Sequence, residues 1–339
     1  MTERGFRPVT GEKVWTPADF VGRDEWIHRL SDAALADIDA AVEAMRARGD
    51  TLDDVTAADF DLPSLAKDLS EINLILGQGR GFVLIKGLAE AGYSEEALGI
   101  AFWGIGTHIG TGVSQSFRGD RLGHVRDIGE TDRYYTAGGE LEMHMDPTDV
   151  VGLLCVQPSA SGGLSRIASS LNVHNIILSE RPDLMETLSE GFIYGRRHSD
   201  LGGAAQGTSN RIPVFAELEG SFACHFLPLA VRGAAENLGV EMTDTELEAL
   251  AFVDQVAQRA DVHMNMDFQH GDIQLLNNRI TLHARTDYVD AEDPALKRHL
   301  LRLWLMVDSW PPLPPFMRMQ GPTDRAGGGI AKAAARPRA

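Results

Sequence analysis

The sequence has little cysteine and no long hydrophobic run. Cys155 and Cys224 are the only cysteines among 339 residues, which excludes a disulfide framework, and each is expected to be a small buried residue. No stretch approaches the roughly 18 apolar residues that cross a bilayer. The first residues are charged and lack the apolar segment of a secretory signal, so we expect a cytoplasmic protein that does not bind membranes.

Positive charge is also scarce. The chain has 31 Lys and Arg against 49 Asp and Glu, which gives a formal net charge of −18. Proteins that bind nucleic acids usually carry a basic face, and no basic cluster occurs before the C-terminal tail. The composition therefore argues against nucleic acid as a partner, and it leaves both a monomer and a homo-oligomer open.

Hydrophobic residues make up 43% of the chain, enough for a large core. Their spacing predicts amphipathic helices over residues 30–50, 64–79, 94–110 and 243–261, and two helices hinged at Pro182 over residues 172–190. Compact apolar strands are predicted near residues 82, 150, 275 and 303. Because these strands are scattered among helices without a repeat or a linker, the pattern favours one β core decorated with helices.

A histidine and an aspartate lie two residues apart in the segment "ELEMHMDPTD", residues 140–149. If this segment is a strand, alternation places His144 and Asp146 on one side and Met143 and Met145 on the other. An imidazole and a carboxylate supply two of the three ligands of a 2-His-1-carboxylate site, which suits Fe(II). The alternative is a solvated strand end. A second His-x-Asp pair, His198 and Asp200, leads into the Gly-rich stretch 201–211 and is interpreted as a loop.

A third ligand must come from another histidine. His174 falls in a predicted helix and His299 on the apolar face of the last strand, so both are interpreted as structural. His283 is the strongest candidate because it lies in a short strand, "RITLHA", that follows the turn Asn277-Asn278-Arg279. The alternative is a hydrogen-bonded strand histidine without a metal.

The last predicted strand, "RHLLRLWLMVD", carries two arginines on one face. Alternation places Arg298, Leu300, Arg302, Trp304 and Met306 on that face and Leu301, Leu303, Leu305 and Val307 on the other. Arginines among apolar neighbours are costly unless they meet anions, and a guanidinium matches a carboxylate. The Cα atoms of Arg298 and Arg302 lie about 13 Å apart along a strand, so the two side chains can bind two different anions. The alternative is a pair of exposed arginines on an edge strand.

These segments together resemble one enzyme family. His144-Met-Asp146, the "GGLS" turn at residues 162–165, "NNRITLHAR" around His283 and "RHLLRLWL" from Arg298 are similar in order and spacing to the Fe(II)/2-oxoglutarate-dependent dioxygenases, in the taurine dioxygenase and clavaminate synthase-like branch. The resemblance covers residues from about 80 to about 308. It implies a β-rich α+β fold, with a double-stranded β-helix (jelly roll) core and surrounding α-helices.

The resemblance also implies a division of the chain. We expect a helical extension over residues 1–80 that packs on the core, a jelly-roll domain with helical insertions over residues 81–310, and a loose tail over residues 311–339. The Gly-rich stretch 201–211 is a candidate lid.

Site residues follow from the same resemblance. His144, Asp146 and His283 match the iron ligands. Arg298, fifteen residues after His283, matches the arginine that binds the far carboxylate of 2-oxoglutarate, and Ser165 matches a hydroxyl residue on that carboxylate. Two further residues are candidates for contacts with the substrate: Arg302 matches the position that binds its anionic group in taurine-type members, and Gln115 lies in a polar loop before the metal strand.

The implied function is an oxygenase that uses Fe(II), 2-oxoglutarate and O2. It would hydroxylate an unactivated C–H of a small anionic molecule, a carboxylate or a sulfonate, and release succinate and CO2. Two alternatives are a non-catalytic, cupin-like protein that binds a metal or a small molecule, and an iron oxygenase independent of 2-oxoglutarate. The first leaves Arg298 unexplained, and the second makes Arg298 dispensable. The residues just before the His-x-Asp pair, Leu141 to Met143, depart from the Asn or Trp that the family often has there, which leaves the substrate open.

Overall fold

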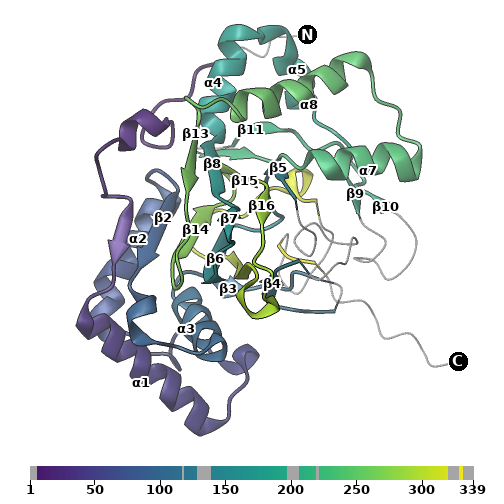
Figure 1. The fold of residues 1–339 in the computed structure, drawn as a ribbon. Coiled ribbons are helices and arrows are strands. Elements are labelled where there is room, and N and C mark those ends of the chain that lie inside the picture. Colours follow the sequence, from purple (N-terminus) through teal and green to yellow (C-terminus); the bar gives the residue numbers. More distant parts are fainter. Residues whose placement is uncertain are drawn as a thin grey trace, which may run out of the picture.

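Two β-sheets lie face to face at the centre of the protein, with helices on both outer sides (Figure 1). The computed structural model describes residues 6–116, 118–127, 139–196, 206–218, 221–319 and 328–330. The second His-x-Asp pair and residues 201–205 of the candidate lid lie outside these ranges. No helix in the described part of the chain is long and apolar enough to cross a membrane.

The larger sheet has seven strands. Its order is β1-β2-β14-β6-β17-β3, and β4 also pairs with β17. The strands are β1 (Ile27–Arg29), β2 (Phe82–Lys86), β3 (Thr111–Gly112), β4 (Leu122–Val125), β6 (Val150–Gln157), β14 (Ile273–Asn277) and β17 (His299–Met306). The four predicted strands are therefore β2, β14, β6 and β17, and they are neighbours in the sheet. β1 pairs in parallel with β2 in a region whose sequence we expect to be mostly helical.

The smaller sheet has four antiparallel strands in the order β13-β8-β15-β5. They are β5 (Leu141–His144), β8 (Ser165–Ser169), β13 (His263–Met266) and β15 (Thr281–Arg285). Three two-stranded ribbons accompany the sheets: β7 with β16 (Ser161–Gly162, Tyr288–Val289), β9 with β10 (Gly195–Arg196, Gln206–Gly207) and β11 with β12 (Phe215–Leu218, Ser221–Cys224).

Side-chain alternation divides the core into layers. Between the sheets, Cys155 and Leu300 of the larger sheet pack with Ile167 and Met266 of the smaller one. The outer face of the larger sheet, which includes Leu301, packs against helices α1, α2 and α3. The outer face of the smaller sheet packs against α4, α5, α7 and α8. Both cysteines are free and buried, as predicted.

The helices mostly follow the sequence pattern. They are α1 (Asp32–Arg48), α2 (Ala66–Gly77), α3 (Glu95–Thr107), α4 (Ser170–Glu180), α5 (Met185–Glu190), α7 (Pro228–Leu238) and α8 (Asp244–Ala257). Short 3-10 turns cover Pro17–Phe20, Leu52–Asp54, Pro63–Leu65, Leu88–Ala91, Pro182–Leu184, Pro294–Leu296 and Pro315–Met317. Ser94 caps α3 through the backbone N–H of Ala97, and α1 ends at Gly49, whose φ of 72° is left-handed. α7 has no counterpart among the helices predicted from the sequence.

The C-terminal tail contributes buried residues. In its described part, Met317 and Met319 pack under the helices of the smaller sheet. Ile330 packs with Val113 and Trp304 on the interior side of the larger sheet. These stretches pack on the body of the protein, in contrast to the loose tail expected from composition.

The packing of α3 depends on a glycine. A Cβ atom at Gly104 would lie 2.3 Å from Phe60, which is fully buried. We expect Gly104→Ala to lower the free energy of unfolding by about 1–3 kcal/mol, because the buried ring must shift. The control is Gly233→Ala in α7, where the nearest atom is 4.0 Å away and alanine should stabilise the helix by about 0.5–1 kcal/mol. Urea unfolding measures both; equal stability of Gly104→Ala and the wild type would contradict this account.

Candidate active site

The structure brings the three predicted metal ligands together. β5 pairs with β15 so that His144 lies opposite His283, and Asp146 follows two residues after β5 ends. His144 Nε2 lies 4.0 Å and His283 Nε2 lies 3.7 Å from the Asp146 carboxylate. The ligand atoms of the three buried side chains are all within 4.8 Å of one another.

The turn before β15 holds the segment that carries Asp146. Asn278 Oδ1 accepts the backbone N–H of Asp146 at 3.1 Å. Its Nδ2 donates to the backbone carbonyls of Asp146 and Thr148. Met143 and Met145 point instead into the apolar layer under the helices, as alternation predicts. One amide side chain thus ties the His-x-Asp segment to the strand of His283, and the sequence reasoning assigned it no role.

The protonation of the ligands suits a cation. His144 Nδ1 lies 2.8 Å from the Glu142 carbonyl oxygen, which leaves Nε2 to face the other ligands. Burial, and then the neighbouring His283, lower the pKa of His144 to about 3, so its ring is neutral at pH 7. Burial alone would raise the pKa of Asp146, but Arg302 and the two histidines outweigh it and hold that pKa below its usual range. An ionised carboxylate beside imidazole nitrogens is a donor set for a divalent metal.

Side chains of β17 orient the carboxylate. Trp304 Nε1 donates to Asp146 Oδ2 at 2.9 Å, and Arg302 Nη1 lies 3.4 Å from the same oxygen. Arg302 Nε in turn donates to Gln115 Oε1 at 2.7 Å. The Gln115 amide donates to the backbone carbonyls of Arg302 and Arg121, both at 2.7 Å. The two predicted substrate residues, Arg302 and Gln115, are therefore a buried pair beside the metal ligands.

Arg298 lies in a second buried polar group. Its guanidinium is 5.3 Å from the ring of Tyr288, and that of Arg285 is 4.9 Å from the same ring. Burial, and then nearby Arg285, lower the pKa of Arg298 to about 10. Within the described residues, Arg298 Nη1 and Tyr288 Oη are buried without a hydrogen-bond partner. Buried donors without acceptors are costly, so this group fits an anionic ligand.

The Gly-Gly turn makes room for Arg298. Gly163 has a φ of +67°, and a Cβ there would lie 3.0 Å from Arg298 Nε, so both the backbone and the space favour glycine. Ser165, two residues later, lies opposite Arg285 in the strand register and donates to Gln274 Oε1 at 3.1 Å. Alternation along β15 places Arg285 on the face of His283, whereas no sequence signal pointed to Tyr288 or Gln274.

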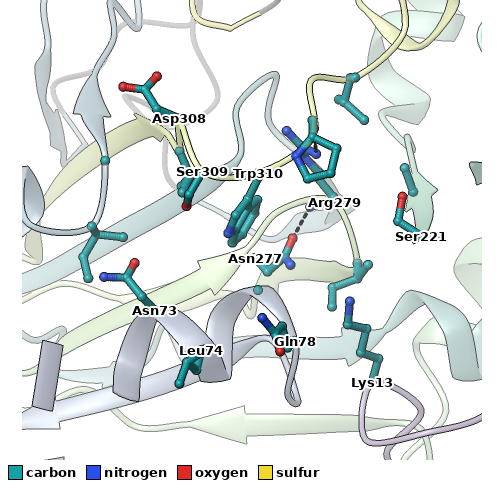
Figure 2. Close-up of a pocket in the computed structure, with 18 of the residues that line it drawn as sticks. Lys13, Asn73, Leu74, Gln78, Ser221, Asn277, Arg279, Asp308, Ser309 and Trp310 are labelled. Atoms are coloured by element: carbon teal, nitrogen blue, oxygen red, sulfur yellow. Dashed lines mark hydrogen bonds between the residues drawn. The ribbon is translucent and has the colours of Figure 1, made fainter. Parts of the chain in front are cut away.

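A separate hollow lies elsewhere on the protein. It has a volume of about 780 Å³ and is lined by residues such as Lys13, Asn73 and Trp310 (Figure 2). Arg279 also lines it, but its guanidinium is bound to Asp149 at 2.6 Å and lies 5.4 Å from the Trp310 ring. None of the predicted site residues lines this hollow.

The hydrogen bond from Trp304 generates a test of the metal centre. Trp304→Phe removes the donor to Asp146 and should weaken metal affinity about 10- to 100-fold, the usual effect of losing a partner of a ligand. Trp103→Phe is the matched control, because its indole is also buried but donates to the Val55 carbonyl. Co(II) titration followed by visible absorption measures both. Unchanged affinity in Trp304→Phe, with its fold verified by circular dichroism, would refute this role.

Comparison with known proteins supports the family that the motifs indicate. Residues 47–304 match the family described as Taurine catabolism dioxygenase TauD, TfdA family. FR-33289 synthase of Streptomyces rubellomurinus is 30% identical over 312 residues, which cover 89% of this chain and 91% of that protein.

Solved structures show the same fold. Asparagine oxygenase in complex with Fe(II), 3-hydroxyasparagine and succinate superposes with a TM-score of 0.67 at 16% identity, over 83% of this chain and 94% of that one. The non-heme iron oxygenase OrfP in complex with Fe and alpha-ketoglutaric acid gives a TM-score of 0.60 at 13% identity, over 83% and 94%. The predicted cofactor and cosubstrate agree with the ligands of these two proteins. The chain belongs to the TauD/TfdA family of dioxygenases, and the family and enzyme class predicted from its motifs are confirmed.

Proposed function

We propose that this dioxygenase uses Fe(II), 2-oxoglutarate and O2 to hydroxylate an unactivated C–H of a small anionic molecule. One observation carries the proposal: a buried His-Asp-His triad shares the interior between the sheets with Arg298, whose Nη1 lacks a hydrogen-bond partner within the described residues. A metal-binding protein without catalysis would need the triad alone. A 2-oxoglutarate-dependent oxygenase needs both groups.

The two facing sheets support the finer fold assignment. In this proposal they are the two faces of a double-stranded β-helix, a jelly roll, over residues 81–310, and β1 of the N-terminal extension joins the larger sheet at its edge. Residues 1–80 form an extension packed on it, since α1 and α2 share a hydrophobic cluster with the larger sheet. Residues 311–339 form the tail.

His144, Asp146 and His283 would hold the iron. Bound Fe(II), with 2-oxoglutarate and O2, supplies the oxidising power for hydroxylation, with succinate and CO2 as products. The protein contributes three ligands on one side of the site, a neutral His144 and an ionised Asp146. Trp304 and Arg302 keep the carboxylate in position, and the buried surroundings exclude water.

Arg298 and its neighbours would bind the far carboxylate of 2-oxoglutarate. The guanidinium fork offers Nη1, and Tyr288 offers its hydroxyl, so a carboxylate satisfies two buried donors at once. The Ser165 hydroxyl, now donating to Gln274, can rotate toward the same oxygens. Arg285, whose guanidinium lies 4.9 Å from the same ring, adds positive charge.

Arg302 and Gln115 would line the part of the active site that binds the substrate. Arg302 donates to Gln115 and lies 3.4 Å from Asp146, so its guanidinium is next to the candidate metal ligands. There it would bind the carboxylate or sulfonate of the substrate, with Gln115 beside that contact. The hydroxylated asparagine bound to asparagine oxygenase favours an amino-acid-like carboxylate over a sulfonate.

Arg298→Gln tests the cosubstrate site. Anaerobic addition of Fe(II) and 2-oxoglutarate to the wild type should give a weak visible absorption band. In the variant the affinity for 2-oxoglutarate should fall about 10- to 100-fold, because a charged hydrogen bond is lost, while Fe(II) still binds. Arg166→Gln is the matched control, since Arg166 follows Ser165 in β8 but bonds to Asn265 and Gln258. Unchanged 2-oxoglutarate affinity and activity in Arg298→Gln would favour an oxygenase independent of 2-oxoglutarate.

Arg302→Gln tests the substrate side. A screen of succinate release over amino acids, acylated amino acids and sulfonates should identify compounds that stimulate the wild type. Fe(II) is added to saturation, which offsets the loss of the contact between Arg302 and Asp146. The variant should then lose this stimulation and keep the slow turnover of 2-oxoglutarate without substrate, because Arg302 would contact the substrate and not the cosubstrate. If both activities fall equally, Arg302 belongs to the cosubstrate site.

A further inference from the structure

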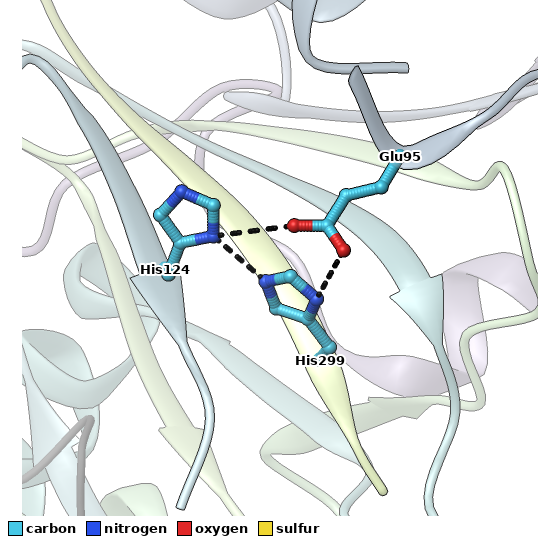
Figure 3. A group of neighbouring side chains, drawn as sticks. All are labelled: Glu95, His124 and His299. Carbon is cyan, nitrogen blue, oxygen red and sulfur yellow. Dashed lines mark hydrogen bonds and ion pairs between the residues drawn. The ribbon is translucent and has the colours of Figure 1, made fainter. Parts of the chain in front are cut away.

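A second group of metal-ligating side chains lies on the other face of the larger sheet. Glu95 is the first residue of α3, His124 lies in β4 and His299 begins β17. Figure 3 shows the three side chains converging from these separate elements. Their ligand atoms lie within 4.8 Å of one another, the same limit that the active-site triad meets.

One atom from each of the three side chains can reach a single ion, because one nitrogen of each ring and a carboxylate oxygen all lie within 4.8 Å of one another. His124 Nδ1 and His299 Nε2 are 2.9 Å apart. The Glu95 carboxylate lies 3.8 Å from His124 Nδ1 and 3.7 Å from His299 Nδ1, too far for hydrogen bonds. Nitrogen and oxygen ligands of a tetrahedral Zn(II) lie about 3.3 Å apart. The carboxylate in the active-site triad lies 4.0 and 3.7 Å from its two imidazoles. The carboxylate of the second group therefore lies at least as close to its imidazoles.

The surroundings give an ion both access and favourable charge. A hollow of about 510 Å³ is lined by Glu95 and His124, together with Asp50 and Glu96. The side chains of Glu95 and His124 are 51% and 46% exposed, whereas that of His299 is 8% exposed.

Other charged groups act on the two histidines. Asp120 acts on His124, and Arg126 is the opposing positive charge near both rings. Burial is the main cause that lowers the pKa of both histidines, that of His299 to about 4. Both rings are therefore neutral at pH 7 and offer lone pairs.

We propose that Glu95, His124 and His299 form a second divalent-cation site, of the kind that binds Zn(II), separate from the catalytic iron. Two imidazoles and a carboxylate are common zinc ligands, and water completes the coordination on the side of the hollow. The His124–His299 hydrogen bond opens when the ion binds, because each ring must turn a lone pair to the metal.

The position of this second site indicates a structural role for the ion. It links α3 and β4 to β17, and β4 pairs with β17 so that Gly123 lies opposite Arg302. A Cβ at Gly123 would lie 2.7 Å from Gln115 Oε1, so β4 packs directly on the Arg302–Gln115 pair. A cation at His124 would hold β4 in this place.

Metal content measured on crossed variants tests the proposal. Protein without a polyhistidine tag is dialysed against Zn(II), and the bound metal is counted by mass spectrometry. The wild type should hold two ions, His124→Ala one, His144→Ala one, and the double variant none. Glu95→Gln should weaken the second ion, whereas Glu96→Gln, its neighbour that pairs with Arg46, should keep both. Because each site is removed separately, failure of this proposal and failure of the iron triad give different counts.

Thermal unfolding supplies an independent readout. Zn(II) should raise the Tm of His144→Ala, because an ion that binds the folded state stabilises it. It should leave the Tm of His144→Ala/His124→Ala unchanged. A single ion in both the wild type and His124→Ala, or two ions in His124→Ala, would overturn the proposal. If His144→Ala does not fold, the counts for the wild type and His124→Ala still decide.

Discussion

The pairing of β5 with β15 is the constraint on which the site depends. Its register sets His144 opposite His283, and Asn278, in the turn before β15, fixes the backbone at Asp146. Three candidate metal ligands, distant in sequence, are thereby placed by one strand pair and one turn. A shift of one residue would turn His144 toward the helices and Met143 toward the candidate metal site. The apolar layer that Met143 and Met145 fill resists that shift.

β17 positions the remaining side chains of the site. Arg298, directly before the strand, reaches Tyr288, and the interior face of β17 brings Arg302 and Trp304 to Asp146. Its outer face carries leucines that pack on α1 to α3, and it begins with His299. The hydrophobic packing of one face thus holds the charged groups of the other face in place, which offsets the cost of burying two arginines between the sheets.

Much of this arrangement was predictable because it follows from alternation along strands. The two faces of β17 and the shared side of His144 and Asp146 follow from the period of two, and the four central strands follow from compact apolar runs. The contacts between distant segments of the site were not predictable. Tyr288 lies in β16, which with β7 forms a short ribbon without an apolar pattern, and nothing in the sequence indicated its approach to Arg298. The sequence placed Gln115 in a polar loop near the substrate but gave no sign of its hydrogen bond with Arg302. Such contacts depend on how segments distant in sequence meet in the fold, and the hydrophobic pattern of a single sequence does not show this.

An anaerobic crystal structure with Fe(II) and 2-oxoglutarate tests the central claim most directly. The account predicts iron bound by His144 Nε2, Asp146 and His283 Nε2, with the far carboxylate of 2-oxoglutarate on Arg298 and Tyr288. Iron bound at other residues, or 2-oxoglutarate seated on Arg302 with Arg298 untouched, would contradict it.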